Sequence, residues 1–202
     1  MSGIISDNLS KSSGLIKSAS VSVDYVKLAT YATSGAESEL VCDGDFSSDY
    51  KHYLYFFNYI YPSNSSNAAH FYMRYRSGGS TLTGSNWKIS SSGGYNDLNG
   101  SQSTNVWDPG YNNSAAILHM GQWGSDQVTG LTGHMYIYDP LNTVNYKRYS
   151  AWFGFMRGDE DTMKQTWSCG VYTTGQGTAL SGITLYPSTG NITATVTMYG
   201  IK

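Results

Sequence analysis

The histidines of this sequence do not form a recognisable catalytic or metal-binding pattern. His52, His70, His119 and His134 each fall inside a stretch that we expect to be a strand, mostly at outward or edge positions. We interpret them as surface or interface residues. Motifs of the Gly-x-Ser-x-Gly, phosphate-loop and His-Glu-x-x-His types are absent from the sequence. We therefore expect no enzymatic activity, no metal site and no cofactor.

The carboxylates gather in glycine-flanked turns. One group is Asp43-Gly44-Asp45 with Asp49, and the other is Asp159-Glu160-Asp161. Glycoside hydrolysis needs two carboxyl groups at a defined separation, one of them with a raised pKa. Calcium needs several oxygen ligands at a regular spacing. Neither group has such a spacing, so we interpret residues 159–161 as a hairpin tip. An esterase or glycosidase acting on polysaccharide is the third-ranked hypothesis for the function.

Aromatic residues are the strongest chemical signal, because the chain has 18 Tyr and 5 Trp. These amphipathic rings concentrate at protein interfaces and can stack on sugar faces. One hypothesis is that neighbouring subunits cover the outward strand tyrosines, which are Tyr72, Tyr136, Tyr138, Tyr186 and Tyr199. The second is a carbohydrate platform made of Trp87, Tyr95, Trp107, Asp108, Tyr111 and Trp123. The third is that the tyrosines only decorate the surface.

The composition indicates short strands joined by turns and excludes two classes of partner. Only 13% of residues are charged, whereas about 25% is typical, and the chain has 23 Gly. The formal net charge of -2 means that the chain lacks the excess of positive charge that is typical of nucleic-acid-binding proteins. No stretch is apolar enough for membrane insertion. Cys42 and Cys169 are far apart, and we expect Cys169 to be a small buried residue and not a disulfide partner.

Alternating polarity predicts that the chain is all-β. Residues 192–199 alternate strictly, and residues 183–186 do so just before a Pro-Ser-Thr-Gly-Asn interruption, which predicts a closing β-hairpin within one sheet. Residues 52–61 are apolar on both faces. We expect roughly nine or ten strands and no helix, in an antiparallel β-sandwich of jelly-roll type.

The predicted domain organisation has two parts. Residues 1–19 form an extended N-terminal arm, with Ile4, Ile5, Leu15 and Ile16 as candidate docking residues. Residues 20–202 form the sandwich. A long irregular loop is expected at about residues 77–113, where Gly, Ser and Asn dominate. A connection of this length is uncommon in a compact domain unless it has a function or hides secondary structure, and within it only residues 87–90 look like a strand.

Three stretches of the chain resemble small virion structural proteins of tailed, particularly marine, bacteriophages. The opening stretch is Gly3-Ile4-Ile5-Ser6-Asp7-Asn8 followed by Ser12-Ser13-Gly14-Leu15-Ile16-Lys17. The middle stretch is residues 46–61 and Phe71-Tyr72-Met73-Arg74-Tyr75. The last stretch is residues 183–202, which include Ser188-Thr189-Gly190-Asn191.

This resemblance implies a β-rich, non-enzymatic virion protein, such as a fibre, knob or decoration subunit. Its partners would be other virion proteins and further copies of itself, with a trimer favoured. Such a protein is assembled in the host cytoplasm and located in the virion. The alternative is a lectin-like receptor-binding module that recognises host surface glycan through the loop at 77–113.

Overall fold

The computed structural model describes residues 25–63, 70–97, 102–119, 130–156 and 162–202. For residues 95–97, 102–112 and 162 it describes the backbone alone. The candidate docking residues Ile4, Ile5, Leu15 and Ile16 lie outside these ranges. The predicted hairpin tip at 159–161 also lies outside them.

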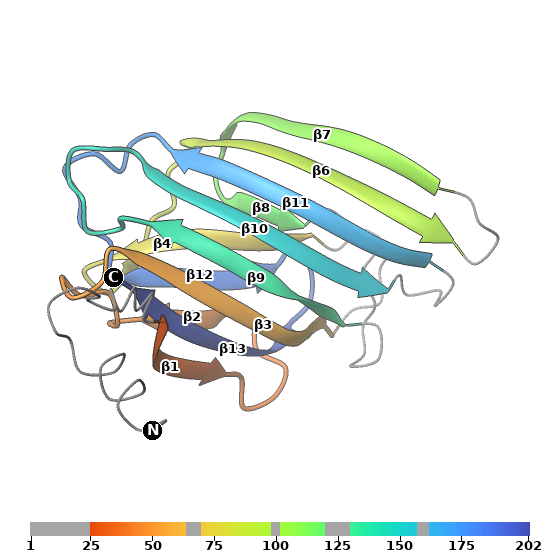
Figure 1. The fold of residues 1–202 in the computed structure, drawn as a ribbon, viewed down its shortest axis with the longest axis horizontal. Helices are drawn as coiled ribbons and strands as arrows, with labels where there is room; N and C mark the ends of the chain where they lie inside the picture. Colours follow the sequence, from red (N-terminus) through yellow and green to blue (C-terminus); the bar gives the residue numbers. More distant parts are fainter. Residues whose placement is uncertain (1–24, 64–69, 98–101, 120–129, 157–161) are drawn as a thin grey trace, which may run out of the picture.

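The described residues form two antiparallel sheets packed face to face, without a helix (Figure 1). The eight-stranded sheet has the order β1 (Tyr25–Ala32), β13 (Ile192–Ile201), β3 (His52–Pro62), β9 (Leu131–Tyr138), β10 (Lys147–Met156), β11 (Thr162–Tyr172), β6 (Trp87–Asp97) and β7 (Gln102–Asn113). The five-stranded sheet contains β2 (Leu40–Asp43), β12 (Gly182–Pro187), β4 (Phe71–Ser77) and β5 (Ser80–Thr81), and β8 (Ala116–His119) pairs with β4. The chain is therefore all-β, as predicted. None of the described residues belongs to a helix long and apolar enough to cross a membrane.

The hydrophobic core lies between the sheets and is rich in aromatic rings. Phe57 and Phe153 from the larger sheet lie 5.1 Å apart between ring centroids, with the rings edge to face. Phe71 from the smaller sheet lies 6.0 Å from Phe57 and 5.9 Å from Phe153. Edge-to-face contacts add to the free energy gained by burying the rings. The three phenylalanines therefore join the two sheets.

The predicted closing hairpin is wrong, although both of its strands exist. β12 pairs with β2 and β4 in the smaller sheet, and β13 pairs with β1 and β3 in the larger sheet. The intervening residues cross from one sheet to the other, and the Ser188 amide donates to the His70 carbonyl at 2.9 Å. Alternation indicates which side chains of a strand are buried but does not identify the partner strand.

The predicted irregular loop at 77–113 is also wrong, because β5, β6 and β7 occupy most of it. β6 pairs with β11 along its whole length and with β7 on its other side. The run Ser90-Ser91-Ser92-Gly93-Gly94 within β6 carries little contrast in hydrophobicity, so the period of two is not visible in the sequence. Asp43, which we expected to lie in a turn, is likewise the last residue of a strand, β2.

A β-bulge within β3 explains why this strand is apolar on both faces. Tyr53, Tyr55 and Phe57 point into the core and are buried. The register shifts between Phe57 and Ile60, and Tyr59 has a φ of 49°. This bulge returns Ile60 to the core, where it is fully buried. The outward-facing residues of β3 form part of the outer face of the eight-stranded sheet.

Candidate functional site

The outer face of the eight-stranded sheet carries most of the exposed aromatic side chains of the described residues. The strand registers place its outward side chains in three cross-strand rows. Row one is Tyr25, Ile201, His52, Tyr138, Arg148, Val171 and Lys88. Row two is Lys27, Tyr199, Leu54, Tyr136, Ser150, Cys169 and Ser90. Row three is Thr30, Thr197, Phe56, His134, Trp152, Trp167 and Ser92.

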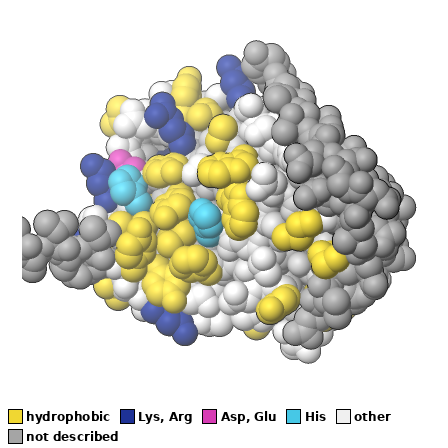
Figure 2. All heavy atoms as spheres, turned by 45° about the vertical axis from the view of Figure 1, so that its right-hand side comes forward, with side chains coloured by type: hydrophobic (Ala, Val, Ile, Leu, Met, Phe, Trp, Pro, Cys, Tyr) yellow, Lys and Arg dark blue, Asp and Glu magenta, His cyan; other side chains and the backbone are white. Residues whose placement is uncertain are grey.

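One half of this face, over β13, β3 and β9, is a continuous aromatic patch. We define the aromatic patch as His52, Phe56, His134, Tyr136, Tyr138 and Tyr199. Ring centroids within it are 5.7 Å apart for Phe56–Tyr199, 5.7 Å for His134–Tyr136 and 6.2 Å for Tyr136–Tyr138. Phe56 retains 43% of its accessible surface. Figure 2 shows hydrophobic side chains gathered on one face around two histidines, with Lys and Arg near the edges.

The other half of the face, over β10, β11 and β6, is hollowed into a trough. Two adjoining hollows, of about 880 Å³ and about 140 Å³, share Ser90, Ser150 and Cys169 as lining residues. These three small side chains lie side by side in row two. The hollow exists because larger side chains border this small-residue floor. Arg148 and Lys88 lie in row one, and Trp167 lies in row three.

Aromatic rings border both ends of the trough. Trp167 lies at one end and retains 58% of its accessible surface, the highest exposure among the described tryptophans. Tyr146 lies at the other end and retains 41%. Tyr138 borders the trough on the side of the aromatic patch. Its hydroxyl lies 2.7 Å from the Ser150 hydroxyl, which fixes the ring over the floor.

The segment that carries Tyr146 is held by several polar contacts. The side-chain oxygen of Asn142 accepts hydrogen bonds from the amides of Val144 and Asn145, at 2.7 and 2.9 Å. The buried Lys147 ammonium donates to the Pro140 carbonyl at 3.0 Å and to the Asn142 carbonyl. Burial lowers the pKa of Lys147, and the charge of Asp139 opposes this effect. Lys147 is thus a positioning residue for this end of the trough.

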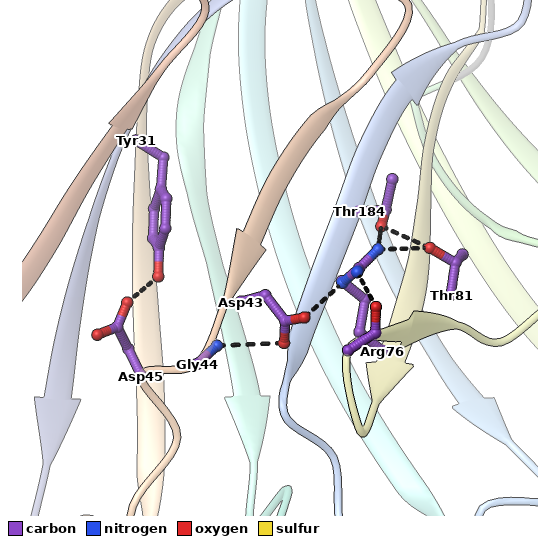
Figure 3. Close-up of polar contacts among 8 residues, drawn as sticks. Tyr31, Asp43, Gly44, Asp45, Arg76, Thr81 and Thr184 are labelled. Carbon is purple, nitrogen blue, oxygen red and sulfur yellow. Dashed lines mark hydrogen bonds and ion pairs between the residues drawn. The ribbon is translucent and has the colours of Figure 1, made fainter.

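A second polar cluster, on the five-stranded sheet, holds strands together (Figure 3). The Arg76 guanidinium forms an ion pair with Asp43 at 2.8 Å and donates to Thr81 and Thr184. It also donates to the Gly79 carbonyl. Burial raises the pKa of the Asp43 carboxyl, but hydrogen bonding and the Arg76 charge outweigh it and hold the pKa below its ordinary value. The guanidinium thereby links β2, β12, β4 and β5.

The histidines lie in separate environments. His119 is buried, with its Nδ1 atom 3.0 Å from the Thr166 hydroxyl and its ring 4.2 Å from that of Phe155. His70 is half-buried, and burial lowers its pKa. His52 and His134 belong to the aromatic patch. Within the described ranges no three His, Cys, Asp or Glu side chains come close enough to hold a metal ion.

Of the residues predicted to form a carbohydrate platform, Trp87 alone has a described side chain. Trp87 is fully buried, with its ring 4.8 Å from that of Tyr75 and 5.1 Å from that of Tyr172, so it faces the core and is unavailable to a ligand. The backbones of Tyr95, Trp107, Asp108 and Tyr111 lie in β6 and β7, but their side chains are outside the description. Trp123 lies outside the described residues altogether.

The residues of the trough were not predicted from the sequence as a site. Cys169 was expected to be buried, yet it is exposed and free, whereas Cys42 is free and buried. The small residues of the floor come from three strands, and nothing in their spacing brings them together. The alternation of residues 164–173 places Trp167 and Cys169 on the same face of the strand. This alternation is the feature of the sequence that could have indicated the site.

Comparisons with known proteins identify no family for this chain. No family model and no curated protein matches it. A Bacteroides ovatus protein of unknown function is 7% identical over 66% of this chain, with a TM-score of 0.20, and the chain spans 45% of its length. The CBM2 module of the evolved Dit of Lactobacillus casei BL23 phage J-1 is 9% identical, with 85% and 76% of the two chains covered and a TM-score of 0.22.

A legume lectin-like domain from Entamoeba histolytica is 9% identical, with 88% of this chain and 84% of that chain covered and a TM-score of 0.24. All three TM-scores are low. These likenesses therefore carry no argument about function, which has to come from the surface of the protein itself.

Proposed function

We propose that this protein is a non-enzymatic structural subunit of a phage virion: a fibre, knob or decoration subunit that associates with further copies of itself through the aromatic patch. The observation that carries the proposal is the patch itself. It joins six aromatic or imidazole side chains from three adjacent strands on one exposed sheet face. Contiguous apolar surface of this kind marks sites of protein association.

The chemistry of the patch favours a second copy of the chain as its occupant. Tyrosine and phenylalanine dominate it, and charged residues lie at its edges, as is typical of the centre and rim of a protein interface. The patch contains no Asp, Glu, Lys or Arg, so two copies can meet there without burying a charge. We propose a trimer, in which the three copies of the patch meet around the threefold axis and leave no open ends.

Two finer features belong to the same proposal. We assign the sandwich to the jelly-roll type, because the chain alternates between the two sheets from β1 to β4 and again from β11 to β13. We also assign residues 1–19 to docking on the particle, on the strength of the resemblance to phage virion proteins. The protein would then be assembled in the host cytoplasm and located in the virion.

The patch is tested by measuring the oligomeric state of the full chain by sedimentation equilibrium. Phe56→Glu places a charge at the centre of the patch and is expected to convert the oligomer to a monomer. Thr195→Glu is the matched control, because Thr195 is exposed on the neighbouring strand β13 but lies outside the patch. A monomeric wild-type chain, or an oligomer unaffected by Phe56→Glu, would reject the patch as the interface.

The docking role of residues 1–19 is tested separately. Deleting them is expected to prevent incorporation into particles while leaving the oligomer intact. The measurement is the amount of this protein in purified virions relative to their major capsid protein. Unchanged incorporation of the truncated chain would reject the docking role.

The alternative function is glycan recognition by the aromatic platform predicted within residues 77–113. The one platform residue with a described side chain, Trp87, is not available for it. Trp87 lies in the core, and the region is a strand pair and not a loop. Glycan binding by the predicted platform therefore has no support from its one described side chain. The trough, which includes Lys88 and Ser90 from the same region, offers a different set of residues to a glycan.

A further inference from the structure

The trough on the outer face of β10, β11 and β6 is a ready-made site for an extended ligand. Its floor is built from Ser90, Ser150 and Cys169, and the larger of its two hollows has a volume of about 880 Å³. Tyr146 directly precedes β10 and lies six residues before Trp152, which pairs with Trp167, so the distance from the Tyr146 end to the Trp167 end is roughly 20 Å at the rise of a strand. We propose that this trough binds an acidic oligosaccharide.

The aromatic rings at the two ends favour a sugar. Trp167 and Tyr146 are both highly exposed, and neither belongs to the aromatic patch. Exposed rings that border a hollow offer flat apolar faces, while their polar atoms and the serine hydroxyls offer hydrogen bonds. A chain of sugar rings presents the same alternation of apolar C–H faces and hydroxyl groups.

The charge of the trough favours an acidic ligand. Arg148 lies in row one beside the floor, and the described lining residues include no Asp or Glu. Across the described part of the chain, the one ion pair within 4.0 Å joins Arg76 and Asp43 on the other sheet, so no described carboxylate neutralises Arg148. A guanidinium binds carboxylate or sulfate oxygens through two parallel hydrogen bonds.

The site is already organised without a ligand. The contact between Tyr138 and Ser150 orients one ring, and the contacts made by Asn142 and Lys147 hold the segment that carries Tyr146. A site whose side chains are already fixed loses less conformational entropy on binding. Binding therefore costs less ordering at Tyr138 and at the segment of Tyr146.

This inference does not depend on the virion proposal. The trough and the aromatic patch share Tyr138 at their boundary, but their other residues differ, so oligomerisation and sugar binding can be lost separately through those residues. Phe56→Glu tests the patch and is expected to leave binding in the trough unchanged.

The experiment is calorimetric titration of the full chain with short oligomers of alginate, which carry carboxylates, and of carrageenan, which carry sulfates. Arg148→Gln and Trp167→Ala are each expected to weaken binding roughly tenfold, the effect of losing one charge-assisted hydrogen bond or one aromatic anchor. Lys27→Gln is the matched control, because it removes an exposed cation from β1 on the same face and is expected to change nothing.

Cys169 provides a direct readout of where the sugar binds. Its thiol is exposed on the floor of the trough, whereas the Cys42 thiol is buried. A saturating acidic oligomer is expected to slow alkylation of Cys169 by iodoacetamide at least about tenfold, because it occupies the floor. The Arg148→Gln variant should need correspondingly more oligomer for the same protection.

Four outcomes would overturn the proposal. The first is an absence of binding by both alginate and carrageenan oligomers. The second is equal affinity for neutral cellulose oligomers of the same length, which would remove the role of charge. The third is equal affinity for polyglutamate, which would show that the trough selects charge and not sugar. The fourth is binding that leaves Cys169 alkylation unchanged, which would place the sugar elsewhere.

Discussion

The rings of Tyr75 and Trp87 lie 4.8 Å apart between the two sheets, and neither the Tyr75 hydroxyl nor the Trp87 indole N–H has a hydrogen-bond partner. Tyr75 comes from β4 and Trp87 from β6, and both are fully buried. Burial raises the pKa of Tyr75 well above its ordinary value, so the hydroxyl stays protonated. The pair stabilises the core through ring packing, in spite of two unpaired polar atoms.

Tyr75→Phe is therefore expected to preserve or increase stability, by up to about 1 kcal/mol, because it removes a buried hydroxyl that has no partner. Tyr149→Phe is the matched comparison, since the Tyr149 hydroxyl lies 2.9 Å from that of Ser168. That change is expected to cost about 1 kcal/mol. Urea unfolding of the two variants measures the difference, and a larger loss for Tyr75→Phe would contradict the assignment.

The Asp43–Arg76 ion pair predicts how stability responds to acid. Because the pKa of Asp43 in the folded protein lies below its ordinary value, folding favours the ionised carboxylate. This contribution is complete above the pKa of the unfolded chain, about 3.9, and is lost as the pH falls through the lower folded value. The free energy of unfolding is thus expected to fall below about pH 4.

In Asp43→Asn the free energy of unfolding should fall less steeply below about pH 4. In Asp49→Asn, which changes an exposed acid, the fall should be the same as in the wild type. Arg76→Leu removes the guanidinium from four partners and is expected to cost about 3 kcal/mol at neutral pH. Urea unfolding across a pH series measures all three variants. An equally steep fall in Asp43→Asn would show that the ion pair does not govern this region of pH.

Gly133→Ala is expected to destabilise the protein by about 3 kcal/mol or more. A Cβ atom at this position would lie 2.1 Å from the Trp152 carbonyl oxygen and 2.7 Å from the Phe153 ring. The carbonyl belongs to the neighbouring strand and cannot rotate away. Gly35→Ala is the control, because no atom lies within 4 Å of its Cβ position. Thermal unfolding should separate the two variants clearly.

The two cysteines are expected to differ sharply in reactivity in the native protein. Burial raises the pKa of the Cys42 thiol, and the thiolate is the reactive form. Cys169 is exposed and should be alkylated without unfolding. Peptide mapping after brief treatment with iodoacetamide should find the label on Cys169, and on both residues only in denaturant. Early labelling of Cys42 would contradict the described core.

Strand polarity was readable from the sequence wherever large apolar residues alternate with polar ones. β13 shows this best, since Ile192, Ala194, Val196 and Met198 are all buried as the alternation predicts. The pairing partners were not readable. Ile183 and Leu185 fit either sheet, and only packing against strands far away in the chain determines that β12 joins β2 and β4.

The candidate site was harder to predict than the fold. The loop at 77–113 was inferred from its Gly and Ser content, but serines and glycines also suit a strand whose outer face borders a hollow. The floor of the trough combines residues as distant in sequence as Ser90 and Cys169. No short-range sequence pattern predicts that these residues lie side by side, so only the registers of β10, β11 and β6 identify the trough.

The crossing between β12 and β13 has a consequence for how the protein is made. β12 is the strand that joins β2 to β4, and β13 is the strand that joins β1 to β3, so residues 182–201 complete both sheets at once. Until the ribosome has released those residues, β1 and β2 have no neighbour to pair with in the native arrangement. Completion of the two sheets is therefore expected to be a late step of folding that waits for residues 182–201.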